Sequence, residues 1–205
     1  MNHFCTYCDR GYVARLLCLY DSFLAQKEAF QLSVLCFDAD TEAIVSSINS
    51  PSLIAIPLAE LLAADSEFAG VRGKRTKIEF YFTATPVLVR HCLSREPHAG
   101  RMTYLDSDLF FFGPASAVFS EQKDASVGIV PHRFPPRLEE LLKWGTYNVA
   151  WVSFCRDRDG LACLEWWREK CLEWCHDYLD GGRFADQGYL NEFSQRFAGV
   201  NVVNH

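Results

Sequence analysis

Residues 101–112 read Arg-Met-Thr-Tyr-Leu-Asp-Ser-Asp-Leu-Phe-Phe-Phe, and this stretch decides the fold. Its apolar part, residues 102–105, predicts a buried strand that ends at Asp106. In open α/β sheets, ligands bind beyond the carboxyl ends of the strands. Asp106 and Asp108 therefore stand where two carboxylates can turn toward one hard cation, Mg²⁺ or Mn²⁺, that bridges the phosphates of a substrate.

A solvated turn that happens to hold two aspartates is the alternative interpretation of this stretch. An isolated Asp-x-Asp is a weak signal, but here it lies between Thr-Tyr-Leu and Leu-Phe-Phe-Phe. Carboxylates placed among apolar strands cost free energy unless they are paired or bound to a metal. We therefore favour a binding site at Asp106 and Asp108 over a turn.

The segments on both sides of this stretch alternate between short apolar runs and helical periodicity. This pattern predicts an α/β fold with a mostly parallel sheet, and its first sixty residues predict the β-α-β-α-β start of a doubly wound sheet. The expected strands are 3–7, 31–37, 53–57, 102–105, 126–131, 149–154 and 200–203. The expected helices are 11–24, 40–48, 74–93 with a kink or break at Pro86, 157–178 and 186–197.

Length and composition indicate one globular domain over residues 1–205. The chain is 49% hydrophobic and 22% charged, which are ordinary globular values. Its 20 basic and 26 acidic residues give a net charge of −6, which argues against nucleic acid as the main partner. No run approaches the roughly 20 apolar residues of a membrane span, and the start lacks the features of a signal peptide. We therefore expect a cytoplasmic protein whose nine cysteines are free thiols.

The Tyr-Leu-Asp-Ser-Asp-Leu-Phe-Phe-Phe segment resembles the metal-binding Asp-x-Asp segment of GT-A glycosyltransferases, particularly the family-8-like retaining enzymes. Four further segments match that family in the same order over nearly the whole chain. They are Thr6-Tyr-Cys-Asp9 with Tyr12, Lys74-Arg75, Tyr147-Asn148-Val-Ala-Trp-Val, and Phe184-Ala-Asp186-Gln187-Gly-Tyr-Leu-Asn191. Five ordered matches are far more specific than any one of them.

The resemblance implies a GT-A nucleotide-diphospho-sugar transferase fold, with a central mixed, mostly parallel sheet flanked by helices. It implies an enzyme that moves a sugar, with retention, from a nucleotide-diphosphate donor, UDP-linked by analogy, to a hydroxyl of a glycan, lipid-linked or small-molecule acceptor. The metal, Mn²⁺ or Mg²⁺, would be held by Asp106, Asp108 and His205. The related enzymes continue past this histidine with a Gly and a Pro-Trp segment, so we expect the chain to lack a C-terminal segment after His205.

The same resemblance assigns the remaining site residues. Thr6, Asp9 and Tyr12 match the segment that holds the base, Lys74 and Arg75 match the basic pair near the diphosphate or sugar, and Ser107 lies between the two metal ligands. Asn148, Asp186 and Gln187 match the residues that orient the donor sugar and the acceptor. Each residue type also has a structural explanation: a helix cap for Asp9 and Asp186, a core position for Tyr12, a solvated helix start for Lys74-Arg75, and a turn for Asn148.

Three alternatives remain at this stage. A sugar-phosphate nucleotidyltransferase usually carries a Gly-rich, basic loop after its first strand, whereas residues 8–12 hold a single glycine. A non-catalytic protein that binds nucleotide sugars or carbohydrates would keep the fold without turnover. A thiol-disulfide protein would use Cys5-Thr-Tyr-Cys8, which has redox spacing.

Three further sets of residues have competing interpretations. Cys163, Trp167, Cys171, Trp174 and Cys175 fall on one helical arc, which favours a core over a metal site that includes His176. His132 ends a strand near the expected cleft, where it either contacts an acceptor or caps the strand. The five tryptophans are mostly core residues by expectation, but they leave open contacts with sugars or with a membrane surface.

Overall fold

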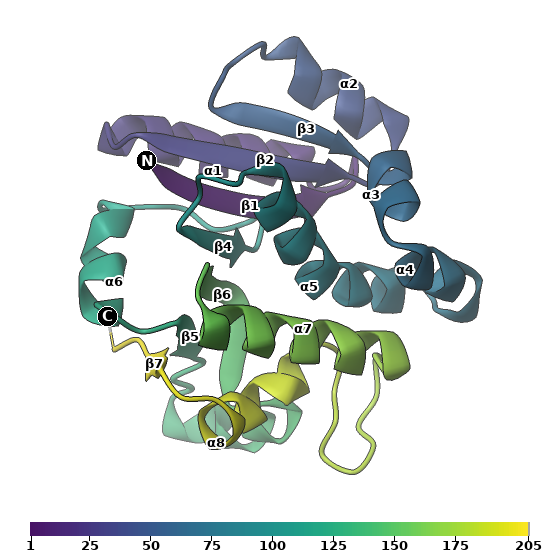
Figure 1. Cartoon of the computed structure of the whole chain (residues 1–205), viewed down its shortest axis with the longest axis vertical. Coiled ribbons are helices and arrows are strands. Elements are labelled where there is room, and N and C mark those ends of the chain that lie inside the picture. The colour runs from purple at the N-terminus through teal and green to yellow at the C-terminus, as the bar shows by residue number, and fades with distance from the viewer. Residues whose placement is uncertain (205) are drawn as a thin grey trace.

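The structure, a computed structural model, describes residues 1–204 and is built on one seven-stranded sheet (Figure 1). Its strands are β1 (Asn2–Cys8), β2 (Phe30–Cys36), β3 (Leu53–Pro57), β4 (Arg101–Leu105), β5 (Val127–Pro131), β6 (Tyr147–Cys155) and β7 (Val200–Val202). The α-helices are α1 (Val13–Gln26), α2 (Ala39–Ser47), α3 (Leu58–Ala64), α4 (Ser66–Val71), α5 (Lys77–Arg95), α6 (Ala115–Gln122), α7 (Arg158–Glu173) and α8 (Phe193–Arg196). Three 3₁₀ segments complete it: η1 (Arg72–Lys74), η2 (Pro136–Trp144) and η3 (Gln187–Glu192).

The strand order is β3-β2-β1-β4-β6-β5-β7, and the sheet is mixed but mostly parallel, as expected. Strands β1 to β4 run parallel, β6 runs antiparallel to both β4 and β5, and β7 is parallel to β5. The chain leaves β1 for β2 on one side, while β4 pairs with β1 on the other. The carboxyl ends of β1 and β4 therefore form a topological switch point, where open α/β sheets bind their ligands.

Two hydrophobic cores cover the two faces of the sheet, because successive residues of a strand point to opposite faces. Along β1, Phe4 belongs to the core under α1, and Cys5 belongs to the core under α5 and α7. Helices α5 and α7 lie side by side on the face of the sheet toward the viewer in Figure 1. These helices hold the parts of the site that come from the second half of the chain.

All seven strands lie within two residues of their predicted bounds, whereas the helices differ more. Helix α5 starts at Lys77 rather than 74, because Thr76 and Glu79 form a capping box at its start. Pro86 lies inside this one helix, so of the kink or break expected there, the break is wrong. Helix α7 ends at Glu173, five residues early, since Trp174 adopts an extended backbone. The helix expected over 186–197 is η3 followed by the single turn of α8.

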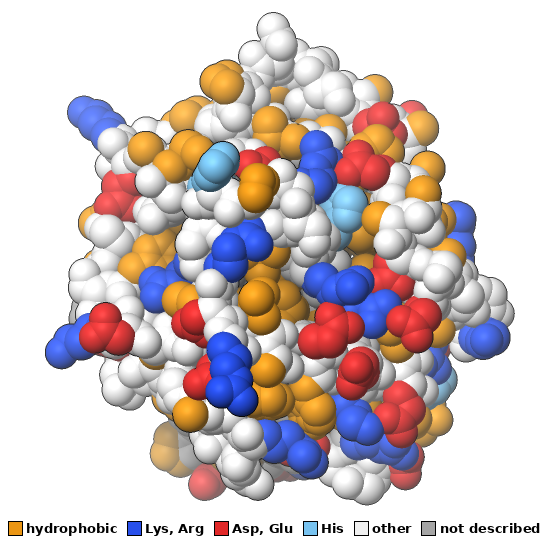
Figure 2. All heavy atoms as spheres, viewed as in Figure 1, with side chains coloured by type: hydrophobic (Ala, Val, Ile, Leu, Met, Phe, Trp, Pro, Cys, Tyr) orange, Lys and Arg blue, Asp and Glu red, His pale blue; other side chains and the backbone are white. Residues whose placement is uncertain are grey.

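The surface over α5 and α7 mixes both signs of charge (Figure 2). Ion pairs join Arg90 to Glu165, Arg95 to Glu60 and Arg168 to Glu67. This face therefore carries no continuous basic patch of the kind that binds nucleic acid. Among the helices of residues 1–204, none is both long and apolar enough to cross a membrane.

Candidate active site

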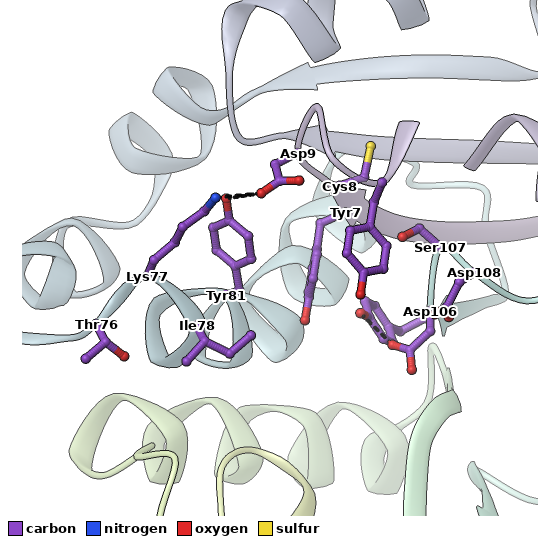
Figure 3. Close-up of a pocket in the computed structure, with 12 residues that line it drawn as sticks. Tyr7, Cys8, Asp9, Thr76, Lys77, Ile78, Tyr81, Asp106, Ser107 and Asp108 are labelled. Carbon is purple, nitrogen blue, oxygen red and sulfur yellow. Dashed lines mark hydrogen bonds and ion pairs between the residues drawn. The ribbon is translucent and has the colours of Figure 1, made fainter. Parts of the chain in front are cut away.

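A cavity of about 570 Å³ opens at the topological switch point, between the ends of β1 and β4 and the first turns of α5 (Figure 3). Asp106, Ser107 and Asp108, which directly follow β4, line one end of this cavity. Asp9, which directly follows β1, lines the other end together with Lys77 and Tyr81 of α5. We call it the first cavity. Its two ends bring together segments that lie about a hundred residues apart in the sequence.

Asp106 is the more enclosed of the two carboxylates predicted to bind metal. The Tyr104 hydroxyl donates to Asp106 Oδ1 over 3.1 Å, and Ser107 beside it is only 7% exposed. Burial raises the pKa of the Asp106 carboxyl to about 6; the hydrogen bond from Tyr104 opposes this shift, and the Asp108 carboxylate adds to it. Asp108 itself is exposed at the mouth of the cavity. The stretch that follows β4 therefore presents one half-buried and one exposed carboxylate.

Asp186 places a third carboxylate close enough to Asp106 to repel it. It precedes η3 and is 4% exposed, but its side chain accepts no capping hydrogen bond there. Its backbone carbonyl accepts from Trp167 Nε1 over 2.9 Å, which fixes its position. Burial raises the pKa of the Asp186 carboxyl to about 7; the Thr85 hydroxyl opposes the shift, and the charge of Asp106 adds to it. A helix cap is therefore not the reason for an aspartate at this position.

The carboxylates in this region lack cationic partners. In residues 1–204, no Lys or Arg forms an ion pair with Asp106, Asp108 or Asp186. Unpaired buried carboxylates are costly, and oxygen donors of this type suit a hard divalent cation. The residues present therefore fit such an ion, which would sit within reach of a ligand in the first cavity.

The protein ligands alone do not complete a metal site. The described part of the chain has no group of three or more His, Cys, Asp or Glu side chains arranged to hold a metal ion. Asp106 and Asp108 would thus leave coordination positions open for phosphate oxygens and water, as Mg²⁺ sites commonly do. His205, the third expected metal ligand, lies outside the described residues.

The opposite end of the first cavity is held by an ion pair and stacked rings. Lys77 Nζ lies 2.7 Å from Asp9 Oδ2, and the Tyr81 hydroxyl donates to the same oxygen over 3.2 Å. The bond and charge of Lys77 hold the pKa of the Asp9 carboxyl below its usual range, against the effect of burial. Tyr81 stacks on Phe37 with ring centroids 3.7 Å apart. Tyr12, also in the lining, is 45% exposed rather than a core residue.

Sequence reasoning missed Lys77 and Tyr81, although a signal for them exists. The two residues are four apart on α5 and so lie on one face of that helix.

Asp9 is not the cap of a helix, which was the alternative interpretation of this residue. Its Oδ1 accepts from Gly11 N over 2.9 Å in a turn, and Tyr12 is the residue at the N-cap of α1.

Six of the predicted site residues that the structure describes do not line the first cavity: Thr6, Lys74, Arg75, Asn148, Asp186 and Gln187. Thr6 is fully buried within β1, and Lys74 is exposed on η1. Asn148 accepts from Ala150 N through Oδ1 over 2.9 Å, next to an irregularity in the β5–β6 pairing. Arg75 turns toward the loop after α7, where its Nη1 lies 2.6 Å from His176 Nε2. Both residues of the basic pair thus lie outside the first cavity, whereas Lys77 lines it.

Gln187 lines a second cavity, of about 410 Å³, that adjoins Asp186 along the chain. The second cavity is lined by His132, Phe134, Leu141, Trp144, Asp177, Phe184 and Gln187. Gln187 Nε2 donates to the Trp144 carbonyl over 3.2 Å. Gln187 therefore lines the second cavity, whereas Asp186, its neighbour in the chain, lines neither of the two cavities.

The cysteines do not form a redox or metal site. All nine are free, and burial raises the pKa of the Cys8 thiol to about 12, the reverse of what a thiol-disulfide protein needs. Cys163, Cys171 and Cys175 are fully buried together with Trp167, so the expected core is confirmed, although Trp174 and Cys175 lie beyond the end of α7. His176 bonds Glu79 through Nδ1 over 2.9 Å instead of a metal.

Comparison with solved structures identifies the class of fold. The galactosyltransferase LgtC in complex with donor and acceptor sugar analogs is 16% identical, with a TM-score of 0.61 over 98% of this chain and 73% of that chain. Mouse xyloside xylosyltransferase 1 is 14% identical, with a TM-score of 0.63 over 99% and 85%. The chain has the GT-A fold of nucleotide-diphospho-sugar transferases, as the sequence motifs predicted.

Comparison with curated proteins identifies the family. The chain is 32% identical over 204 residues to the uncharacterized protein YfnF of Bacillus subtilis (strain 168), covering 96% of this chain and 67% of that protein. It is 28% identical to YfnD of the same organism, covering 98% and 65%. The chain belongs to the family of YfnF, and it spans about two thirds of the length of these relatives. No family model matches it.

Proposed function

We propose that the chain is a metal-dependent glycosyltransferase that moves a hexose-type sugar from a nucleotide-diphosphate donor, UDP-linked, to an acceptor hydroxyl. The observation that carries this proposal is the lack of a cationic partner, within residues 1–204, for Asp106 and Asp108 at one end of the first cavity and for the buried Asp186, whose charge interacts with that of Asp106. A protein keeps such a costly arrangement where a ligand supplies the missing positive charge.

In this proposal the ends of the first cavity bind the two ends of the nucleotide. Asp106 and Asp108 hold Mn²⁺ or Mg²⁺, which supplies charge neutralisation to the leaving diphosphate. The Asp9 carboxylate accepts from an N–H of the base, and the rings of Tyr12 and Tyr81 stack on it. Lys77, the cation in the lining, lies beside Asp9 and reaches from there to a phosphate oxygen.

The transferred sugar lies between Asp106 and Asp186. Asp186 and Gln187 orient the sugar and the incoming hydroxyl, which lowers the entropic part of the barrier. Asn148 contributes through its amide N–H donors, because its carbonyl oxygen is bonded to Ala150 N. The resemblance to retaining enzymes supports retention of the anomeric configuration, and the free thiols support a cytoplasmic location.

Calorimetric titration of UDP tests the donor site. We expect binding in the presence of Mn²⁺ that falls by about 100-fold, or about 2.7 kcal/mol, in chelator and in the Asp106→Asn/Asp108→Asn variant. Asp159→Asn, which changes a half-buried aspartate of the first turn of α7 that does not line the first cavity, is the matched control and binds UDP as the unmodified chain does. Binding of UDP that needs neither metal nor carboxylates, or no binding of any nucleoside diphosphate, would sink the proposal.

A sugar-phosphate nucleotidyltransferase is the second candidate. The 4-diphosphocytidyl-2C-methyl-D-erythritol synthase of Anaerococcus prevotii is 13% identical, with a TM-score of 0.57 over 99% of this chain and 86% of that chain. Such an enzyme releases pyrophosphate from a nucleoside triphosphate and a sugar phosphate, whereas a glycosyltransferase releases a nucleoside diphosphate from a nucleotide sugar. A non-catalytic binding protein releases neither, so assays of the two products separate the three functions.

A further inference from the structure

The backbone of Asp106 is held on both sides at the end of β4. Its N–H donates to the Ala150 carbonyl of β6 over 3.3 Å, and its own carbonyl accepts from Leu109 N over 3.3 Å. These two bonds give the side chain a fixed starting point beside the first cavity. The direction of each carboxylate oxygen then depends on the contacts that the side chain itself makes.

The Tyr104 hydroxyl engages one of the two carboxylate oxygens of Asp106. It donates to Oδ1 over 3.1 Å, and the ring that carries it is buried. Among the residues that the structure describes, none forms a hydrogen bond or an ion pair with Oδ2. Asp106 therefore has one oxygen that the protein has already bonded and one that is available to a ligand.

A row of aromatic rings in the lining of the first cavity fixes the position of this hydroxyl. The ring centroid of Tyr7 lies 5.5 Å from that of Tyr104 and 5.9 Å from that of Tyr81. Tyr81 in turn stacks on Phe37 with centroids 3.7 Å apart. A ring packed in this way moves only when its neighbours move as well. The bond from Tyr104 to Oδ1 is therefore a stable feature of the site.

Hard divalent cations differ in how they use a carboxylate. Mg²⁺ demands near-octahedral geometry and is held by one or two carboxylates together with phosphate oxygens and water. Ca²⁺ is larger, takes about six to eight oxygen ligands and often binds both oxygens of one carboxylate. A cation that bound both oxygens of Asp106 would come against the hydroxyl proton of Tyr104 at Oδ1. The bond from Tyr104 therefore opposes the two-oxygen mode that suits Ca²⁺.

We propose that Tyr104 is a specificity-determining residue for the cation of the donor site, and this inference rests on the proposed function. Tyr104 keeps Oδ1 of Asp106 engaged and leaves Oδ2 as the oxygen for the cation, which favours Mg²⁺ or Mn²⁺ over Ca²⁺. Asp108 is exposed, and no hydrogen bond to its carboxylate is present within residues 1–204. The preference therefore arises at Asp106, and Tyr104 acts through that residue as a positioning residue.

Electron paramagnetic resonance of Mn²⁺ tests this inference on the chain alone, because free and protein-bound Mn²⁺ give different signals. Ca²⁺ is titrated against bound Mn²⁺ in the unmodified chain and in Tyr104→Phe, which keeps the ring and removes the hydroxyl. We expect Ca²⁺ to displace Mn²⁺ at a concentration about tenfold lower in Tyr104→Phe. Tyr81→Phe is the matched control, because it removes the hydroxyl that bonds Asp9 at the other end of the cavity and leaves the competition unchanged.

The unmodified chain supplies a second measurement that does not depend on how well the variant folds. We expect Mg²⁺ to displace bound Mn²⁺ at a concentration about tenfold lower than Ca²⁺ does. Equal displacement by Mg²⁺ and Ca²⁺, no binding of Mn²⁺ to the unmodified chain, or the same competition by Ca²⁺ in Tyr104→Phe would each overturn the inference.

A parallel titration of UDP in the presence of Mn²⁺ separates this inference from the proposed function. If UDP binds and the competition by Ca²⁺ is unchanged in Tyr104→Phe, the role of Tyr104 is wrong while the donor site stands. If the competition shifts in Tyr104→Phe and UDP does not bind, Tyr104 selects the cation and the transferase proposal fails.

Discussion

Lys77 Nζ lies 2.7 Å from Asp9 Oδ2, and this ion pair joins the start of α5 to the end of β1 at the mouth of the first cavity. The lysine is 72% exposed and the aspartate 18%, so the pair lies on the boundary between cavity and solvent. An exposed pair of this type contributes roughly 0–1 kcal/mol to stability. Lys77 is therefore free, in energetic terms, to move from Asp9 to an anionic ligand.

Replacing Lys77 should weaken the binding of phosphates and spare the binding of the base. We expect Lys77→Ala to weaken UDP binding by about tenfold, or about 1.4 kcal/mol, because it removes the cation from the cavity lining. Uridine, which lacks phosphates, should bind both proteins within about twofold. Calorimetric titration of both ligands at one ionic strength measures the difference.

Lys74→Ala is the comparison that decides between the sequence expectation and the structure. Lys74 belongs to the basic pair that the resemblance assigned to the donor, but it is exposed on η1, outside the cavity. We expect UDP binding to be unchanged in this variant. A larger loss in Lys74→Ala than in Lys77→Ala would show that the segment before α5 rearranges around the ligand.

The strands were predictable because their signal is local. Each is a short apolar run, and even the central β4 ends at the predicted Leu105, directly before Asp106. The helices from 58 to 71 and the 3₁₀ segment over 136–144 were not predicted, since they are short and depend on tertiary contacts. The early end of α7 has the same origin: Tyr189 bonds the Trp174 carbonyl from a distant segment over 2.8 Å.

Site residues that directly follow a strand could be predicted from the sequence. Site residues at the start of a helix could not, because the start of the helix sets the direction in which each side chain points. Asp9 and Asp106 reach the first cavity because both follow parallel neighbouring strands. Arg75 and Lys77 are two residues apart, yet Arg75 faces His176 and Lys77 faces Asp9. That difference depends on Thr76, which starts α5 between them, and on a partner from a loop a hundred residues away.

Removing the Asp186 carboxylate should stabilise the fold while abolishing transfer. Burial raises the pKa of this carboxyl from its ordinary 3.8 to about 7, so the ionised form opposes folding. That penalty is absent below about pH 3.8 and is complete above pH 7. We expect Asp186→Asn to be more stable than the unmodified chain by about 1–3 kcal/mol at pH 8 in chelator, and equally stable near pH 4.

Thermal unfolding at the two pH values, with a transfer assay, measures this effect. Asp157→Asn is the matched control, because Asp157 also begins a helix but accepts from Gly160 N over 2.8 Å as a true cap. Since asparagine caps equally well, its stability should change by less than about 0.5 kcal/mol. Lower stability of Asp186→Asn at pH 8 would mean that favourable contacts hold the carboxylate, and retained transfer would remove Asp186 from the mechanism.

Breaking the buried ion pair of Asp65 and Arg168 should destabilise the fold strongly. Arg168 donates to both Asp65 oxygens at 2.8 Å, and Asp65 Oδ1 also accepts from Phe68 N at the start of α4. Asp65→Ala leaves a buried guanidinium without its main partner, so we expect a loss of about 3–5 kcal/mol in urea unfolding. Glu67→Gln removes an exposed partner of the same guanidinium and should cost less than about 1 kcal/mol. Equal losses in the two variants would contradict this account.

The acid stability of the protein should depend on Glu79, which ties α5 to the loop after α7. Its carboxylate accepts from Thr76 N over 2.8 Å, from His176 Nδ1 over 2.9 Å and from Asp177 N over 3.3 Å. Burial alone would raise the pKa of this carboxyl, but these hydrogen bonds outweigh it and lower the pKa from 4.5 to about 2. The ionised form therefore stabilises the fold, fully above about pH 4.5, and this contribution is lost as the pH falls toward 2.

Glu79→Gln isolates this contribution. We expect the variant to be less stable by about 3 kcal/mol at pH 6, and the difference to shrink by about half at pH 3, because the unmodified chain loses stability there and the variant has no charge to lose. Urea unfolding followed by circular dichroism at pH 3, 4.5 and 6 gives the three values. Glu173→Gln changes an exposed carboxylate whose pKa is also lowered, by its bond to Lys170, and it should show a much smaller trend because solvent screens this pair. A difference for Glu79→Gln that stays constant with pH would mean that the shape of the side chain, and not its charge, stabilises the start of α5.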